Sequence, residues 1–176
     1  FHSILLWILL KIIKLHYSNE EFNPEKIFEF ITQKIIDYQD PSIDRDVISN
    51  YLEFWILLAD YERKIVKNNI LKDKLNDCCK LNENINYDPP REIYRDFCST
   101  ATERLTDKLL FIMLMIDPKD QDSEDLNKKM PHMSATCCLQ SFFKLNPEDV
   151  FLRIKEYWLT EMNLYFEKFR QKKEEN

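Results

Sequence analysis

The chain contains no glycine among its 176 residues. Glycine supplies the positive φ angles of tight β-hairpin turns, and it lets a backbone approach a phosphate closely. Its absence argues against an antiparallel β protein, a phosphate-binding P-loop and a dinucleotide-binding fingerprint. Because 44% of the residues are hydrophobic and 32% are charged, the chain is not of the disordered class either. The composition therefore favours an all-α protein.

Four dipeptides of asparagine or aspartate followed by proline punctuate the chain, at Asn23-Pro24, Asp40-Pro41, Asp88-Pro89 and Asn146-Pro147. The polar side chain can accept hydrogen bonds from the free N–H groups of a helix start, and proline fits the first helical turn. We therefore predict that a helix begins at each of the four positions. Their spacing is uneven, which indicates helical hairpins rather than a strict sequence repeat.

The densest apolar pattern lies between residues 40 and 67. Apolar residues recur there at steps of three and four, which places them along one side of an α-helix. They are Val47, Tyr51, Phe54, Trp55, Leu58, Tyr61 and Ile65. We expect this helix to be an inner member of the packed array, covered by the other helices.

Similar patterns predict five further helices and one doubtful one. Residues 2–17 present Ile4, Leu5, Ile8, Leu9, Ile12 and Leu15, broadened by Trp7 and Leu10. The helix after Pro24 presents Ile27, Phe28, Ile31, Ile35 and Tyr38. A helix over residues 93–116 presents Ile93, Phe97, Ala101, Leu105, Leu109, Ile112 and Ile116. Residues 130–145 turn Cys137, Cys138, Leu139, Phe142 and Phe143 inward. Residues 148–172 present an apolar stripe of Val150, Phe151, Ile154, Trp158, Met162, Tyr165, Phe166 and Phe169. A short helix with Ile70, Leu71, Leu75, Cys78, Cys79 and Leu81 is weakly indicated.

The first fifteen residues are strongly apolar, but they include Lys11 and Lys14 and are shorter than the ~20 residues that span a bilayer. They carry no signal for cleavage. A helix that is apolar on nearly all sides is buried on more than one of them. We therefore expect this helix to pack between two layers, in a single all-helical segment over residues 1–176 that is a fragment of a longer chain.

The segment 117–129 is charged and poor in hydrophobic residues, and we expect a disordered linker there. The net charge of the whole chain is −6. This charge disfavours a non-specific binder of nucleic acid, which needs a basic face.

The five cysteines, Cys78, Cys79, Cys98, Cys137 and Cys138, are odd in number and include two adjacent pairs. This is not the pattern of a disulfide framework, so we expect a reducing compartment, the cytosol or the nucleus. His132 precedes one cysteine pair, but adjacent side chains on a helix point ~100° apart and do not form a usual zinc site. We expect these cysteines to be small core residues.

No motif of a hydrolase, zinc protease or nucleotide-binding enzyme is present. We therefore assign no catalytic, cofactor-binding or metal-ligating residue, and an enzyme with a dispersed site remains a third possibility. Trp7, Trp55 and Trp158 all lie on apolar stripes, and the default expectation for each is a place in the core. A binding groove requires one of them to be exposed.

Three stretches resemble HEAT-type helical hairpins of the importin-β/exportin (karyopherin) kind. They are residues 44–63 (DRDVISNYLEFWILLADYER), residues 88–115 (DPPREIYRDFCSTATERLTDKLLFIMLM) and residues 133–158 (MSATCCLQSFFKLNPEDVFLRIKEYW). The resemblance implies antiparallel helical hairpins stacked as a segment of an α-solenoid. It also implies a non-enzymatic scaffold of a nuclear transport receptor, with Ran-GTP and cargo proteins as partners and neither a membrane nor a cofactor.

A second resemblance covers Leu52-Glu53-Phe54-Trp55 with Asp60-Tyr61, then Ile93-Tyr94 with Phe97, then the apolar pattern from Val150 to Phe169. This order is similar to that of a regulator-of-G-protein-signalling domain. The likeness implies a GTPase-activating protein acting on Gα, and it predicts that Trp55, Tyr94 and Phe166 meet in one core. The transport-type scaffold is our first hypothesis, and this regulator is its alternative.

Overall fold

A computed structural model describes residues 2–40, 45–80, 90–115 and 130–174. Helices account for most of these residues, and no strand occurs among them. The all-α class is therefore confirmed. The helices are α1 (His2–His16), α2 (Glu25–Ile36), α3 (Arg45–Lys80), α4 (Phe97–Leu114), α5 (Pro131–Leu145) and α6 (Pro147–Glu174).

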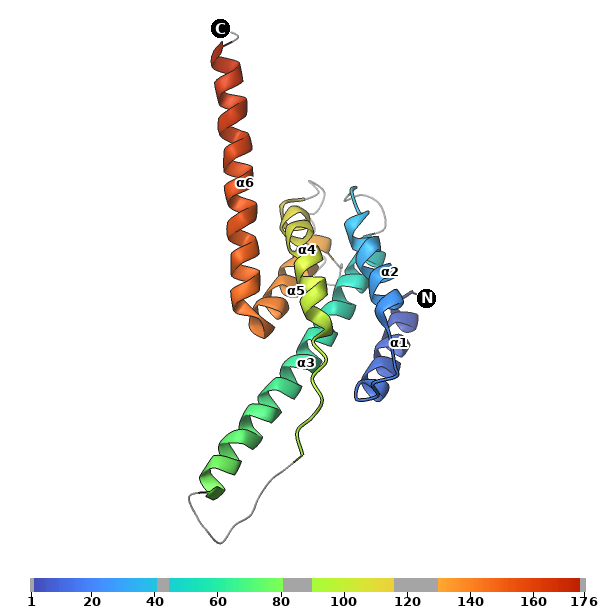
Figure 1. Ribbon diagram of the computed structural model, residues 1–176. Helices are drawn as coiled ribbons and strands as arrows, with labels where there is room; N and C mark the ends of the chain where they lie inside the picture. The colour runs from blue at the N-terminus through green and yellow to red at the C-terminus, as the bar shows by residue number, and fades with distance from the viewer. Residues whose placement is uncertain (1, 41–44, 81–89, 116–129, 175–176) are drawn as a thin grey trace.

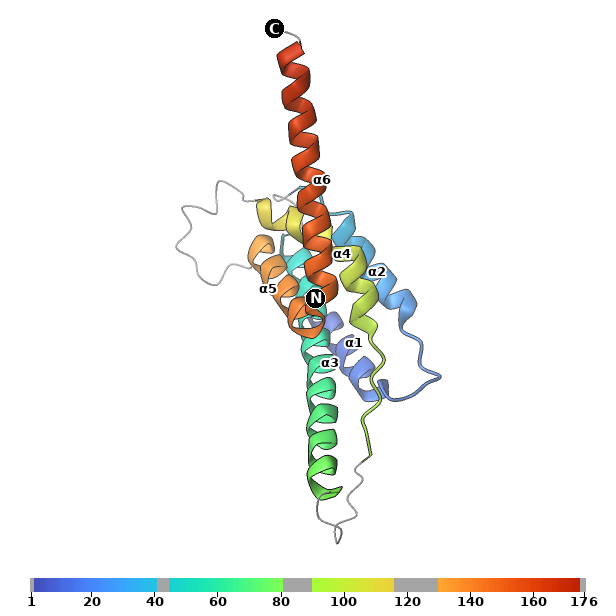
Figure 2. The ribbon, with the colours of Figure 1, turned by 60° about the vertical axis from the view of Figure 1, so that its left-hand side comes forward.

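Helix α3 is the axis of the molecule. It contacts α1, α2, α4 and α5, which surround its first half (Figure 1). The second half of α3 and most of α6 extend away from this helical body in different directions (Figures 1 and 2). One contiguous apolar core fills the body, and α6 contributes Val150 to its fully buried part.

The predicted apolar stripe of α3 forms the centre of this core. Trp55 is 1% exposed, and its ring lies 5.3 Å from that of Phe28 in α2 and 6.3 Å from that of Phe142 in α5, measured between centroids. The other fully buried members of the stripe are Tyr51, Phe54, Leu58 and Ile65, and Val47 and Tyr61 are partly buried. The prediction for this stripe is confirmed.

Helix α1 packs with a different face from the one predicted. Leu6, Leu10 and Ile13 point into the core, followed by Tyr17 just after the helix. Most of the predicted face is solvent-exposed, namely Ile4, Leu5, Ile8, Ile12 and Leu15, together with Trp7. An apolar pattern on all sides of a helix carries no information about which side faces the core. In the part of the chain that the structure describes, α1 contacts α3 alone among the helices, so the predicted burial between two layers is also wrong there.

Two of the Asn-Pro signals mark helix starts as predicted. The side chain of Asn23 accepts a hydrogen bond of 2.9 Å from the N–H of Glu25, the first residue of α2. Helix α6 begins at Pro147, and the Asn146 amide donates to the Asp149 carboxylate in the first turn. Pro41 lies outside the described residues, and α3 begins at Arg45.

The predicted helix start after Asp88-Pro89 is wrong. Residues 90–96 form an irregular strap along α3, and α4 begins only at Phe97. Asp96 precedes the helix with a positive φ of 52°, so the chain turns sharply there. Ile93 is consequently 43% exposed, whereas Ala101, Leu105, Leu109 and Ile112 are buried as predicted. Ile116 lies outside the described residues.

Helix α3 is longer than predicted, because it continues past Lys67 to Lys80. The predicted short helix is the second half of α3, and its apolar residues Ile70, Leu71 and Leu75 are exposed. Leu81 lies outside the described residues. In this half, α3 contacts the strap through polar side chains, as described below, and not through a buried apolar face.

The inward face of α5 is confirmed in part. Cys138, Leu139 and Phe142 are buried, whereas Cys137 is exposed and Phe143 is 45% exposed. Cys137 precedes the buried Cys138, and Phe143 follows the buried Phe142. Both are exposed because adjacent residues on a helix point in different directions.

The apolar stripe predicted for α6 meets the core only at its beginning. Val150 is buried and Ile154 partly buried. Five predicted members are exposed by half or more, namely Phe151, Trp158, Met162, Tyr165 and Phe166. They are exposed because α6 contacts α4 and α5 near its start and then leaves the body (Figure 1).

The predicted pairing of successive helices holds for α2 with α3 but not for α1 with α2. Within the described residues, no Cα atom of α1 lies within 8 Å of one in α2, because both helices pack separately on α3. The stacking of hairpins as a solenoid stays a prediction. The charged segment predicted at residues 117–129 lies outside the described residues.

Candidate functional site

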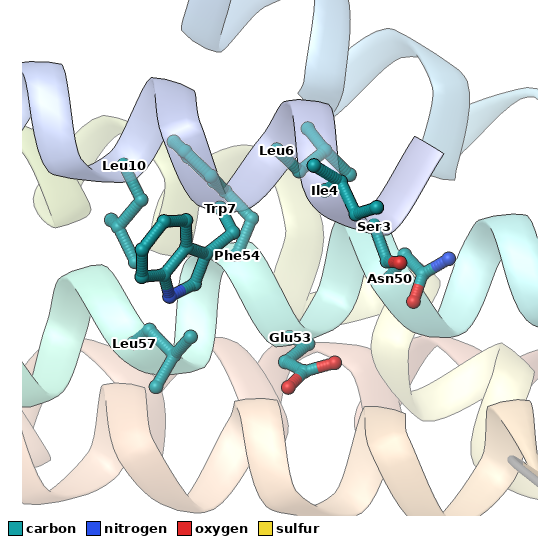
Figure 3. Close-up of a pocket in the computed structure, with 9 residues that line it drawn as sticks. All are labelled: Ser3, Ile4, Leu6, Trp7, Leu10, Asn50, Glu53, Phe54 and Leu57. Carbon is teal, nitrogen blue, oxygen red and sulfur yellow. The ribbon is translucent and has the colours of Figure 1, made fainter. Parts of the chain in front are cut away.

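A groove between α1 and the first half of α3 forms a cavity with a volume of about 570 Å³. Figure 3 shows side chains of both helices converging on it. It is lined by Ser3, Ile4, Leu6, Trp7 and Leu10 from α1 and by Asn50, Glu53, Phe54 and Leu57 from α3. Its size is within the range of binding pockets.

The groove exists because α1 turns only a narrow face into the core. Leu6 and Leu10 contact the core beside Phe54, so Ile4 and Trp7 stand at the rim. The Trp7 side chain is 55% exposed, and the Lys11 ammonium nitrogen lies 5.1 Å from its ring centroid. The predicted core position of Trp7 is therefore wrong, and this residue meets the condition for a binding groove.

Most of the groove lining is apolar, with three polar side chains at Ser3, Asn50 and Glu53. Such a lining offers contact area for an apolar partner and a few polar groups that fix its orientation. No two of these three side chains form a nucleophile and base pair of the kind that acyl or phosphoryl transfer requires.

A fully buried carboxyl group lies elsewhere, at Glu62 in the middle of α3. Its side chain is fully buried, and burial raises the pKa of its carboxyl above the usual range. Three donors partly oppose this effect. The Tyr17 hydroxyl and the Phe97 N–H donate to Oε1 at 2.8 Å each, and the Cys98 N–H donates to Oε2 at 3.1 Å.

These bonds make Glu62 the cap of a helix that lies 35 residues later in the chain. The N–H groups of Phe97 and Cys98 belong to the first turn of α4, where no residue of the same helix can bond them. A negative group at this end is also favoured by the helix dipole. Glu62 therefore holds α4 on α3, and its oxygens are occupied by structural contacts.

Tyr17 extends this network from α1 to the strap. Its hydroxyl accepts a hydrogen bond of 3.1 Å from the N–H of Arg95. The Arg95 guanidinium in turn donates to the carbonyl oxygens of Asn19 and Phe22, at 2.9 and 2.8 Å. Burial and the neighbouring Glu62 raise the pKa of Tyr17, so the phenol stays protonated and can donate.

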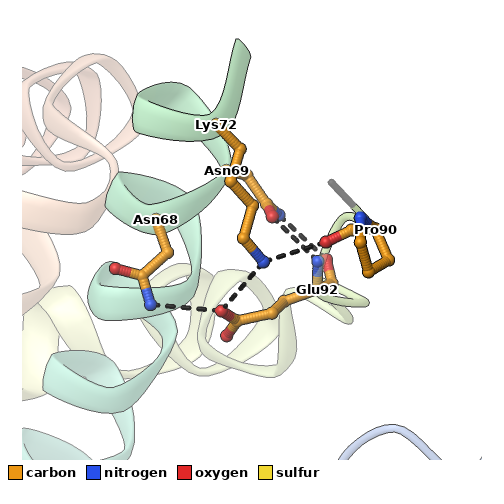
Figure 4. A network of polar contacts seen from close by, with 5 residues as sticks. All are labelled: Asn68, Asn69, Lys72, Pro90 and Glu92. Carbon is orange, nitrogen blue, oxygen red and sulfur yellow. Dashed lines mark hydrogen bonds and ion pairs between the residues drawn. The ribbon is translucent and has the colours of Figure 1, made fainter. Parts of the chain in front are cut away.

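A second polar cluster fastens the strap to the projecting half of α3 (Figure 4). The Asn69 amide donates to the Glu92 carbonyl at 2.8 Å and accepts from the Glu92 N–H at 2.9 Å, as a neighbouring β-strand would. Lys72 donates to the Pro90 carbonyl at 2.9 Å, and Asn68 donates to the Glu92 carboxylate at 3.2 Å. The cluster is exposed, and its bonds join the strap to α3.

A cavity of about 450 Å³ between α2 and α4 includes five charged side chains in its lining, those of Glu25, Glu29, Arg95, Asp96 and Arg104. Two of these side chains form hydrogen bonds within the fold. Arg95 bonds the α1–α2 link as described above, and the Asp96 carboxylate accepts a bond of 2.7 Å from the Tyr94 hydroxyl. The charges do not form an arrangement that we can assign to a reaction.

The residues weighed as metal ligands are not brought together. Cys137 is exposed and Cys138 is buried. Among the described residues, no group of three or more histidine, cysteine, aspartate or glutamate side chains is placed to hold a metal ion. Burial raises the pKa of the Cys98 and Cys138 thiols, which opposes formation of a reactive thiolate.

The geometry expected of a regulator-of-G-protein-signalling domain is not found. Trp55 is buried, but Tyr94 is 38% exposed and Phe166 is 55% exposed. Tyr94 belongs to the strap and Phe166 to the projecting part of α6, so the three side chains do not share a core. The order of aromatic residues along the chain could not reveal this, because it does not report where a helix leaves the body.

No family model, curated protein or solved structure matches this chain. Over the described residues, no helix combines the length and the apolar character that crossing a membrane requires.

Proposed function

We propose that the chain is a non-enzymatic, protein-binding helical module whose groove between α1 and α3 receives an amphipathic helix of a partner protein. The observation that carries this proposal is the exposed Trp7 at the rim of a largely apolar groove. Amphipathic helices bind such grooves through residues spaced three and four apart. Tryptophan is enriched among the residues that supply most of the binding energy at interfaces.

A capture experiment tests this role of the groove. The whole chain is immobilised, and proteins retained from a cell extract are identified for the wild type, Trp7→Ala and Leu15→Ala. Leu15 is a matched control because it lies on α1, is 80% exposed and does not line the groove. We expect a partner that Trp7→Ala loses and Leu15→Ala retains. Equal retention by both variants contradicts the proposal.

The finer proposal is a HEAT-like solenoid segment of a nuclear transport receptor that binds Ran-GTP and cargo. The resemblance of residues 44–63, 88–115 and 133–158 to karyopherin hairpins supports it, as does the acidic net charge of −6. The contacts of α3 with four helices do not add support, since a solenoid unit contacts mainly its neighbours. The five free cysteines support the accompanying proposal of the cytosol or nucleus.

Purified Ran tests the finer proposal directly. The immobilised chain is exposed to Ran locked in its GTP form or loaded with GDP. Selective retention of the GTP form is expected for a transport receptor, and equal retention or none overturns this assignment without affecting the broader binding role. Acceleration of GTP hydrolysis by purified Gα would instead favour the alternative, a GTPase-activating domain.

A further inference from the structure

The free face of α6 repeats with a period of seven residues. Phe151, Trp158 and Tyr165 are seven apart, and so are their neighbours Leu152, Leu159 and Phe166. Met162 lies three residues after Leu159, and Lys155 occupies the equivalent place one heptad earlier. In the heptad notation these three rows are positions g, a and d. Positions a and d form the core of a coiled coil and g flanks it, and the three rows together are here called the seam. Lys155 is the single polar residue in the seam between residues 151 and 166.

Apart from Leu152, which lines a cavity together with Ser99 and Thr102 of α4, this seam is separate from the face that α6 uses within its own chain. Val150, Ile154 and Tyr157, which are buried or partly buried at the start of α6, occupy positions f, c and f of the same heptads. Positions c and f lie on the side of a helix away from a and d. From Trp158 onward the seam points away from α4 and α5, because every described side chain of α6 after Tyr157 is exposed. The later part of α6 stands clear of the body (Figures 1 and 2).

The seam is exposed along its whole length. Its apolar members are between 50% and 67% exposed, and they comprise Phe151, Leu152, Trp158, Leu159, Met162, Tyr165 and Phe166. Scattered exposed apolar residues are ordinary, but a contiguous apolar stripe marks an interaction surface. A helix without packing is also only marginally stable in water, because most helical stability in proteins comes from a covered apolar face.

We propose that this seam pairs with the α6 seam of a second copy of the chain, as an antiparallel two-helix coiled coil. An apolar seam with a seven-residue period can pair with its own copy, because the same seam bends around that copy in a left-handed supercoil. A two-fold axis relates the two helices, so both copies use the same surface and the assembly ends at two copies. Such two-fold dimers are the commonest homo-oligomers.

The flanking positions select the antiparallel direction. In a parallel pair, each g residue lies beside an e residue of the other helix, so Trp158 would meet Asn163 and Tyr165 would meet Arg170. In an antiparallel pair, g residues meet g residues and e residues meet e residues. The aromatic rings then pack together on one flank, and Glu156, Asn163 and Arg170 share the other flank with both signs of charge.

We assign the register in which Leu159 lies opposite Met162 of the second copy, and Met162 opposite its Leu159, since both of these central layers are apolar. Trp158 then lies beside Tyr165 of the second copy. The seam from residue 151 to residue 166 is only about 24 Å long at 1.5 Å per residue, so we expect a dimer that dissociates on dilution. The free apolar face of α1 is a rival site for α6, since α1 carries Lys11 and Lys14 without an acidic residue.

Sedimentation equilibrium of the full chain over a range of micromolar concentrations tests the pairing. We expect a monomer–dimer equilibrium that Leu159→Glu and Trp158→Ala each weaken at least about tenfold. Thr160→Glu is the matched control, because it adds the same charge to exposed α6 outside the seam. Circular dichroism of each variant confirms that the helical body is intact. A monomer at all concentrations, or a dimer that Leu159→Glu leaves unchanged, overturns the proposal.

Disulfide capture tests the direction of pairing. Chains carrying Leu159→Cys are mixed with chains carrying Met162→Cys, and mass spectrometry of peptides identifies the linked sulfurs among all cysteines present. The proposal predicts a link between positions 159 and 162 of different copies. A dominant link between two copies of Met162→Cys indicates a parallel pair, and a link from either position to a cysteine placed at Ile8 of α1 indicates the rival site. Either result overturns the antiparallel pairing.

Discussion

The two longest helices described, α3 and α6, carry the same kind of apolar stripe, but the stripe is buried on α3 and exposed on α6. On α3, the stripe through Trp55 is the centre of the core, and that tryptophan is 1% exposed. On α6, the stripe through Trp158 faces solvent, and that tryptophan is 55% exposed. Periodicity determines which residues share a face of a helix, but the neighbours that reach the face decide whether it is core or interface. α3 touches four helices along its first half, whereas α6 touches two near its start.

The sharpest test of this comparison is the pair of tryptophan substitutions. Trp55→Ala is expected to cost ~3–5 kcal/mol of unfolding free energy, because it removes a buried ring and leaves a cavity. Trp158→Ala is expected to change the free energy of the monomer by less than ~0.5 kcal/mol, as for other exposed sites. Urea denaturation at a concentration where the chain is monomeric measures both. Comparable losses for the two variants would show that Trp158 is also covered in the monomer.

A second test concerns the polar contact that holds α4 on the buried half of α3. Glu62→Ala leaves the N–H groups of Phe97 and Cys98 and the Tyr17 hydroxyl without their acceptor. We expect a loss of ~3 kcal/mol, since each buried donor without a partner costs ~1–3 kcal/mol and some regain partners by relaxation. Glu156→Ala, on the exposed side of α6, serves as the control in the same denaturation series. A loss as small as that of the control would mean that Glu62 is not an essential cap.

The same carboxyl predicts a dependence of stability on pH. Burial raises the pKa of Glu62 in the folded protein above its value in the unfolded chain. The folded state then binds the proton more tightly, so its contribution is fully present below the unfolded pKa and is lost as pH rises through the folded pKa. We expect the difference in unfolding free energy between the wild type and Glu62→Gln to fall as pH is raised from about 4 towards neutrality. A difference that increases with pH would mean that the three donors lower the pKa instead.

The smallest effect is expected in the projecting half of α3. Asn69→Ala removes both hydrogen bonds to the backbone of Glu92, which are solvent-exposed, so global stability should change by only ~1 kcal/mol or less. Hydrogen exchange of the Glu92 amide should nevertheless become faster, because local opening of the strap is easier. Asn68→Ala is the matched control, since it bonds the Glu92 side chain and not its amide. Unchanged exchange in Asn69→Ala would show that the strap is held by other contacts.

The residues that followed local rules were predicted from sequence, and those that depended on distant partners were not. The absence of glycine indicated an all-α protein, and Asn23 and Pro147 marked helix starts through contacts within a few residues. The start of α4 was misplaced because its cap is Glu62, on another helix. The orientation of α1 was misplaced because apolar residues surround it. The sequence signal for the groove was Trp7, because α1 carries apolar residues on more sides than α3 alone can cover.

The Glu62 contacts also bear on the order of folding. The bond to Tyr17 closes a separation of 45 residues, and the bond to Phe97 closes one of 35 residues. Both loops must close before the carboxyl can reach its three donors, and closure of long loops delays contacts of this kind. An interaction that forms after the rate-limiting barrier leaves the folding rate unchanged and slows unfolding. We therefore expect the Glu62 contacts to form late in folding, to prolong the lifetime of the folded body and to leave the rate of its formation unchanged.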